Sequence, residues 1–153
     1  MRITEYKTIL NEEKLNILVK EKSFNYETKP LTSPNIVVDL LNNCFNLKIQ
    51  SEEYVYMICL NNKGRVLGVF EVSHGTVNAS FVQPREVFNK ALLCGASQII
   101  LAHNHPSGDT SPNTEDIKVY QKMKEASDIM AIPLVDFLII GDDYVSFKER
   151  QIS

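Results

Sequence analysis

The short run SQIILAH (residues 97–103) constrains the fold of this chain most. It is almost wholly apolar, and a run of this length and composition is typical of a β-strand buried on both faces. A polar stretch, NHPSGDTSPNTED, follows it directly. The sequence therefore predicts a covered central sheet in which one buried strand ends in a polar loop.

The flanking segments supply the rest of such a sheet. Apolar periodicity, turn residues and caps predict helices over 31–45, 84–96 and 113–130, and β-hairpins over 53–73 and 134–150, the second with an acidic turn at 141–143. Residues 1–30 are polar and irregular and are expected to form an N-terminal arm or peripheral strands. The order predicts an α/β (α+β) fold, a mixed β-sheet flanked by helices, with one domain over 31–153.

The same patterns give expected caps and core residues. Ser33 is expected to cap the first helix, and Asn113 or Thr114 the third. The inward side chains of the third helix are expected to be Ile117, Tyr120, Met123 and Ile129. The aromatic residues expected in the core are Tyr54, Tyr56, Phe70 and Phe81.

Charge and cysteine content narrow the class of protein. The formal charge of −3 argues against broad, non-specific DNA binding, which needs a basic face, although a local basic patch is compatible with it. Cys44, Cys59 and Cys94 form no CxxC pair, so reduced cysteines are expected rather than a zinc knuckle or a disulfide framework. The N-terminus has no signal-peptide pattern and no apolar run is long enough for a membrane span, so we expect a cytoplasmic protein.

His103 and His105 stand where the apolar strand is expected to end. Residues i and i+2 of a strand point to the same face, so both imidazoles can reach one point. Asp116, in the first turn of the next helix, can be brought back to them by the turn-rich loop. Two histidines and one carboxylate favour zinc (Zn²⁺) and leave a fourth position open, as in catalytic zinc sites. The alternative is a polar loop that binds no metal.

A hydrolase also needs a proton acceptor, and Glu71 is the leading candidate. It interrupts the apolar strand VLGVFEVS, where a carboxylate has no solubility role. The competing interpretation is an edge residue or a paired charge. His74 is expected to be a turn residue, and Ser107 either caps its turn or donates a hydrogen bond to a developing oxyanion.

These residues resemble a known pattern. Glu71, the HxH of HNHPSG, and Asp116 eleven positions later are similar to the JAMM (MPN+) metalloprotease signature. The segments LTSP, GVFEVSHGTVNASFVQPREVF and ASQIILAHNHPSGDTSP resemble the RadC family of bacteria from about residue 31 to the end. The resemblance implies a JAB/MPN fold related to cytidine deaminases, zinc on His103, His105 and Asp116, and Glu71 as general base.

The chain departs from that pattern in two places. Asn113 stands where JAMM proteases carry a serine that stabilises the oxyanion, a role that an amide N–H can also perform. Residues 1–30 are too few for the helix-hairpin-helix module of longer RadC proteins, which are named for DNA repair. We therefore expect a zinc peptidase or isopeptidase acting on a peptide or protein. The alternative is a non-catalytic metal-binding interaction module for DNA-processing partners, and in either case the chain can form a homodimer.

Overall fold

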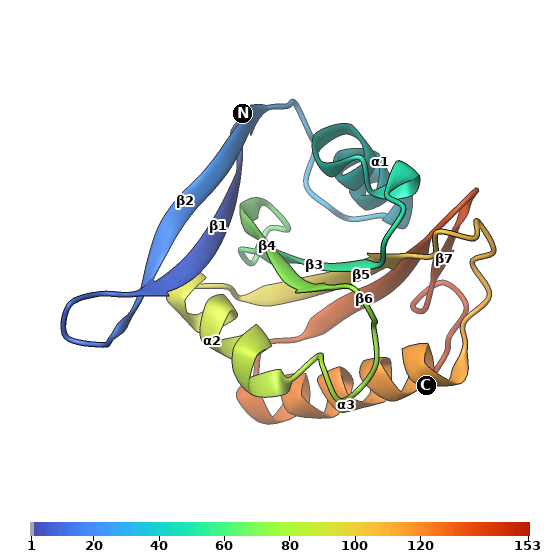
Figure 1. The fold of residues 1–153 in the computed structure, drawn as a ribbon. Helices are drawn as coiled ribbons and strands as arrows, with labels where there is room; N and C mark the ends of the chain where they lie inside the picture. Colours follow the sequence, from blue (N-terminus) through green and yellow to red (C-terminus); the bar gives the residue numbers. More distant parts are fainter. Residues whose placement is uncertain (1) are drawn as a thin grey trace.

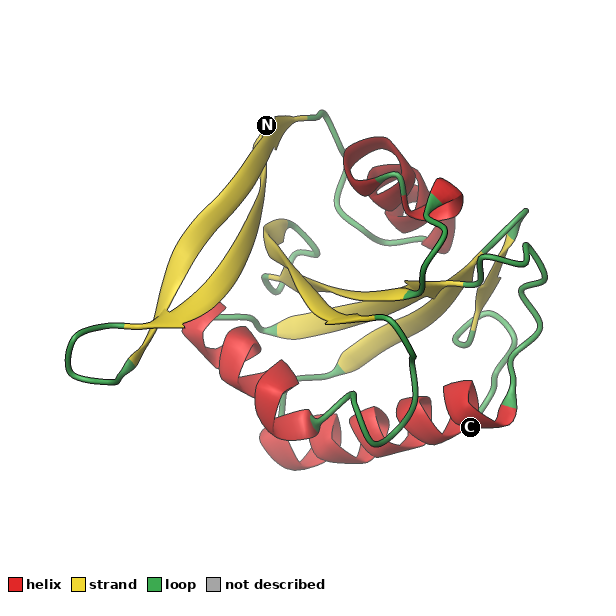
Figure 2. Ribbon diagram, in the orientation of Figure 1, coloured by secondary structure: helices red, strands yellow, loops and turns green. Residues whose placement is uncertain are grey.

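The computed structural model describes residues 2–153 and contains one seven-stranded mixed sheet with three α-helices (Figures 1 and 2). The strands lie in the order β2-β1-β4-β3-β5-β6-β7. The elements are β1 (Arg2–Leu10), β2 (Asn16–Asn25), α1 (Pro34–Phe45), the 3-10 turn η1 (Leu47–Ile49), β3 (Tyr54–Leu60), β4 (Val66–His74), α2 (Pro84–Cys94), β5 (Gln98–Asn104), α3 (Thr114–Met130), β6 (Leu134–Ile140) and β7 (Tyr144–Ser146). The predicted fold class is confirmed.

The helices cover both faces of the sheet, with α1 on one face and α2 and α3 on the other (Figure 1). Side chains alternate along each strand, so the core divides into two clusters. Val55 and Leu101 belong to the cluster under α2 and α3, whereas Tyr56 and Ala102 belong to the cluster under α1. Strand β5 is buried along nearly its whole length, as its apolar sequence predicts.

Local signals explain the helix ends. Pro34 and Pro84 occupy the first turns of α1 and α2, where the missing N–H costs nothing. Gly95 ends α2 at φ +73°, a conformation that glycine adopts without strain. Ser33 is the N-cap residue of α1, but its hydroxyl donates to the Asn35 side chain instead of capping the helix.

The N-terminal segment, expected as an arm or peripheral strands, is the outer hairpin of the sheet. Strand β1 pairs antiparallel with β2 and parallel with β4, where Glu5 lies opposite Val69. The hairpin projects beyond the helices, and its outer strand β2 forms one edge of the sheet (Figures 1 and 2).

Two of the expected core residues are exposed. The inward stripe of α3 runs through Val119, Met123 and Ser127 at a spacing of four, so Ile129 falls on the outer side and is 81% exposed. Phe81 lies in the loop between β4 and α2, outside any element, and is 65% exposed. Within residues 2–153, no helix has the length and apolar character needed to cross a membrane. The three cysteines are free.

Candidate metal centre

His103, His105 and Asp116 meet at the end of β5 and the start of α3. The strand alternation places both imidazoles on the α2/α3 face, and the turn at 106–108 returns the chain toward them. Nε2 of His103 lies 2.9 Å from Oδ1 of Asp116, and Nε2 of His105 lies 3.1 Å from Oδ2. One ligand atom from each residue lies within 4.8 Å of the others.

His103 is fully buried and lacks a hydrogen bond on either ring nitrogen among the described residues. Nε2 of His103 is close to Asp116, but the angle between the two groups does not allow a hydrogen bond. The contact is therefore one of distance only. A buried polar atom without a partner costs free energy. A metal ion would satisfy the lone pair on Nε2.

The tautomer of His105 is fixed by the loop that follows it. Its Nδ1 lies 2.7 Å from the carbonyl oxygen of Asp109, which can only accept, so Nδ1 carries the proton. Its Nε2 faces Oδ2 of Asp116 at 3.1 Å, where a bound metal ion would take the place of a proton between the two groups. This arrangement is the usual outer support of a metal-bound histidine.

Asp116 is held in place by the first turn of its own helix. Its Oδ2 accepts from the backbone N–H of Asn113 at 2.8 Å, and Oδ1 of Asn113 accepts from the N–H of Asp116 at 2.8 Å, which forms a capping box. Burial by itself would raise the pKa of Asp116, but His103, the Asn113 N–H and His105 together hold it below its usual value. Asp116 is therefore a carboxylate at neutral pH, ready to bind a cation.

The three residues fit a zinc ion. Two neutral imidazole nitrogens and one carboxylate are a donor set of catalytic zinc sites, in which the fourth position stays open. The unpartnered nitrogens of His103, the tautomer of His105 and the ionised Asp116 all agree with this interpretation.

The structure does not bring Glu71 to this cluster. Glu71 lies opposite Tyr56, and Tyr56 lies opposite Ala102 on its other side, so these three residues share the α1 face. His103 is the next residue after Ala102 and therefore points to the α2/α3 face. Glu71 instead lines a pocket with Tyr56 and other residues under the N-terminal hairpin.

A different carboxylate, Glu53, stands just before the part of β3 that pairs with His103. Val55 lies opposite His103, and Glu53 is two residues before Val55, in the segment that leads into β3. Beyond this pair the backbone ladder ends, because the N–H of Tyr54 bonds to the side chain of Asn104 and the N–H of His105 bonds to the carbonyl of Ile140. Sequence reasoning missed Glu53 because QSEEY looks like an ordinary polar turn before a strand. The signal that identifies it is its even spacing from a residue that pairs with His103.

The remaining predicted site residues occupy the surrounding loops. Asn113 is the N-cap of α3, and its Oδ1 is engaged there. The Ser107 hydroxyl accepts from the N–H of Asp109 at 3.3 Å, within the turn of HPSG. His74 lies outside the cluster: it ends β4, bonds to Oε2 of Glu52 at 2.9 Å and stacks on Tyr54.

Comparison with known proteins identifies the family. The model of the RadC-like JAB domain matches residues 31–152. A UPF0758 protein of Pelobacter propionicus is 43% identical over 122 residues, which cover 79% of this chain and 52% of that protein. UPF0758 proteins of Clostridium acetobutylicum and Caldanaerobacter subterraneus subsp. tengcongensis are 40% and 41% identical over 82% and 81% of this chain, and over 55% and 53% of their own lengths.

The chain thus spans about half the length of the curated relatives that it matches. The matched region contains the whole His103–His105–Asp116 cluster and excludes the β1–β2 hairpin. The chain belongs to the RadC-like JAB domain family.

Proposed function

We propose that this protein is a zinc-dependent hydrolase that cleaves a peptide or isopeptide bond. The observation that supports it most is the convergence of His103, His105 and Asp116, with outer hydrogen bonds that prepare their ligand atoms. Three protein ligands are typical of a catalytic zinc site, whereas structural zinc is usually closed by four.

In this proposal the metal ion, Glu53 and Asn113 each have a different role in the reaction. Bound zinc supplies Lewis acidity, which polarises a carbonyl group and lowers the pKa of water to about 7. Glu53, two residues before the partner of His103 in the sheet, takes a proton onto its carboxylate and passes it to the leaving amine. The side-chain N–H groups of Asn113 donate to the developing oxyanion, since the cap occupies only its Oδ1.

The assignment of Glu53 replaces the one that the JAMM resemblance implies for Glu71. Glu71 lies two strands from β5, a lateral separation of about 10 Å, and its side chain belongs to the opposite face. We do not extend the proposal to DNA repair, because a formal charge of −3 gives it no electrostatic support.

The first test is the metal content of the purified chain by elemental mass spectrometry. We expect one zinc per chain in the wild type and its loss in the His103→Ala/His105→Ala variant. A wild type without metal, after zinc is supplied and excess removed, would exclude a zinc hydrolase.

The second test separates the candidate bases by cleavage of a peptide library and of isopeptide-linked substrates, read by mass spectrometry. We expect Glu53→Gln to keep zinc and lose about 100-fold to 10,000-fold in rate. The matched control is Glu52→Gln, whose exposed side chain bonds to His74 away from the cluster. If Glu71→Gln loses the rate and Glu53→Gln keeps it, the base is Glu71.

A non-catalytic interaction module is the competing function. It requires only that a bound metal support the fold, and it assigns no proton transfer to Glu53 or Glu71. Cleavage that depends on Glu53 would exclude it, whereas bound zinc with no cleavage of any substrate in the library would favour it.

A further inference from the structure

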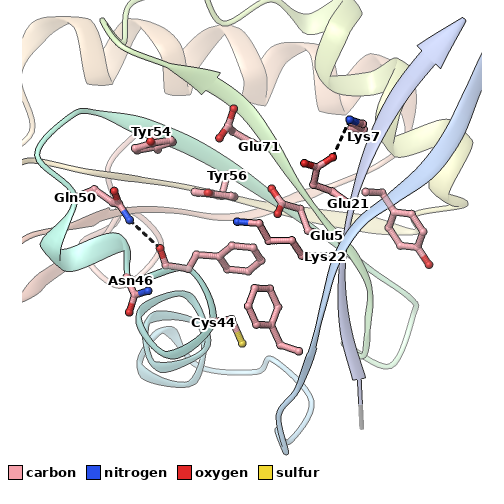
Figure 3. A pocket seen from close by; sticks show the side chains of 13 residues that line it. Glu5, Lys7, Glu21, Lys22, Cys44, Asn46, Gln50, Tyr54, Tyr56 and Glu71 are labelled. Atoms are coloured by element: carbon pink, nitrogen blue, oxygen red, sulfur yellow. Dashed lines mark hydrogen bonds and ion pairs between the residues drawn. The ribbon is translucent and has the colours of Figure 1, made fainter.

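A second site lies on the other face of the sheet, in the pocket between the β1–β2 hairpin and α1 (Figure 3). The pocket has a volume of about 470 Å³, within the usual range for small-ligand sites. Its walls come from β1, β2, the end of α1, β3 and β4. The hairpin lies outside the matched family region, so this pocket is built jointly by the family domain and by residues 2–25.

Glu5 is the most buried charged residue of this pocket. It is only 7% exposed, yet it makes no hydrogen bond or ion pair with any other residue in the range 2–153. Figure 3 shows its carboxylate directed into the space that Tyr56 and Lys22 also line. The charge of Lys22 acts on this carboxylate from the neighbouring strand, and a second cation bound in the pocket would stabilise it further.

The charge of the pocket selects a cation over an anion. Three carboxylates (Glu5, Glu21 and Glu71) and two lysines (Lys7 and Lys22) line it, which leaves one net negative charge. The Lys7 ammonium is already paired with Glu21 at 2.9 Å. Lys22 lies opposite Glu5 in the hairpin register but forms no ion pair with it in the described structure.

Aromatic rings complete the lining. Tyr54 stacks on Tyr56 with ring centroids 6.0 Å apart, and Phe45 packs on Tyr56 at 4.8 Å. Burial, followed by the charges of Glu5 and Glu71, raises the pKa of Tyr56, which keeps its hydroxyl protonated. Tyrosine faces next to carboxylates attract organic cations through cation–π contacts.

A bare metal ion fits this pocket poorly. Among the described residues, the one group of three or more potential ligands within metal-binding distance is His103, His105 and Asp116. Glu5, Glu21 and Glu71 do not converge in that way. Carboxylates on separate strands suit a larger cation whose donors spread over several atoms.

We propose that the pocket binds a guanidinium group, with Glu5 and Glu71 accepting its N–H donors beside the aromatic rings of Tyr54 and Tyr56 that line the pocket. The planar fork of guanidinium pairs with carboxylates and stacks on aromatic rings, which an ammonium does less well. An arginine side chain of a polypeptide and a free guanidino compound share this chemistry.

Calorimetric titration of the full chain tests the site. The probes are N-acetyl-argininamide, its neutral citrulline analogue, and agmatine as a free guanidino amine. We expect saturable binding of the guanidinium probes and none of the citrulline analogue. Tighter binding of the blocked argininamide identifies an arginine side chain as the ligand, and tighter binding of agmatine identifies a free compound.

Variants localise the binding. Glu5→Gln and Glu71→Gln should each weaken it at least about tenfold, while Glu12→Gln in the exposed hairpin loop leaves it unchanged. The proposal is overturned if wild type binds no guanidinium probe, if the citrulline analogue binds equally well, or if both pocket variants bind like wild type. Zinc content, measured in parallel, should stay at the wild-type level in Glu5→Gln, which separates this site from the proposed hydrolase.

Discussion

Asn104, between the two histidines, uses its side chain to hold the neighbouring strand. Its Oδ1 accepts from the N–H of Tyr54 at 2.8 Å, and its Nδ2 donates to the carbonyl of Glu52 at 2.9 Å. These two backbone groups flank Glu53. The amide therefore ties the segment before β3 to the end of β5 and fixes the backbone on both sides of the proposed base.

We predict that Asn104→Ala destabilises the protein by about 2–3 kcal/mol, because two partly buried backbone groups lose their partner. Urea unfolding measures this change. The matched control is Asn43→Ala, which removes an exposed hydrogen bond to the Asp39 carbonyl and should change stability by less than about 0.5 kcal/mol. Equal effects of the two substitutions would contradict the role given to Asn104.

Glu5 makes stability depend on pH in a direction unusual for a carboxylate. Burial, the largest cause, and the charges of Glu71 and Glu21 raise its pKa above 4.5, against the lowering effect of Lys22. Between 4.5 and the raised pKa, the folded protein binds the proton more tightly than the unfolded chain does. This contribution to stability is therefore lost as pH rises through that window.

We predict that Glu5→Gln is more stable than wild type at neutral pH, and that the difference shrinks as pH falls and disappears below 4.5. Denaturant unfolding of both proteins over a pH series, without any guanidinium ligand, provides the measurement. Glu12→Gln, on the exposed hairpin loop, should show no such trend. A variant less stable than wild type at neutral pH would show that Glu5 has an internal partner.

At the scale of elements, the first turn of α3 combines a helix cap with a residue of the candidate metal centre. The side chain of Asn113 caps the helix while its backbone N–H orients Asp116, so the residue affects both stability and the site. Serine, the residue of the JAMM pattern at this position, is an equally good N-cap.

We predict that Asn113→Ala costs about 1 kcal/mol, whereas Asn113→Ser stays within about 0.5 kcal/mol of wild type and keeps its zinc. Thermal unfolding and elemental analysis measure the two effects. If alanine and serine destabilise α3 equally, the side-chain cap has no energetic role.

The helices and most strands could be predicted from sequence because their signals are local. Pro84 and Gly95 bound α2, and the apolar run of β5 has one reasonable interpretation. The pairing of β1 with β4 could not be predicted, since no local signal specifies that Glu5 lies opposite Val69, 64 residues later. The cluster of His103, His105 and Asp116, in contrast, could be predicted, because the spacing of its residues lies within one segment.

A β-bulge in β4 decides toward which face of the sheet the side chain of Glu71 points. Tyr56 lies opposite Glu71, but Val55 lies opposite Ser73, so Val72 is an extra residue in β4. One extra residue inverts which side chains of a strand reach a given face, and the apolar pattern of β4 does not reveal it. The same dependence on register concealed Glu53.

At the scale of the whole molecule, the sheet separates two polar sites. Each site borders a different hydrophobic cluster. The metal centre borders the cluster packed under α2 and α3, and the Glu5 pocket borders the cluster packed under α1. Because each cluster is closed by its own helices, the fold does not depend on a metal ion for its core. Metal therefore adds to stability through binding alone and leaves the unfolding transition cooperative.

We predict that removing zinc with a chelator leaves a folded protein with a lower Tm. Binding contributes about 2.7 kcal/mol when free zinc is a hundred times Kd, which for a chain of this size corresponds to roughly 5–10 °C. Circular dichroism melts with and without zinc measure the shift, and His103→Ala should show none. Argininamide binding, read in the same metal-free sample, should persist because its pocket lies on the opposite face. Loss of the fold on chelation would instead identify a structural metal, as in small domains that fold only around zinc.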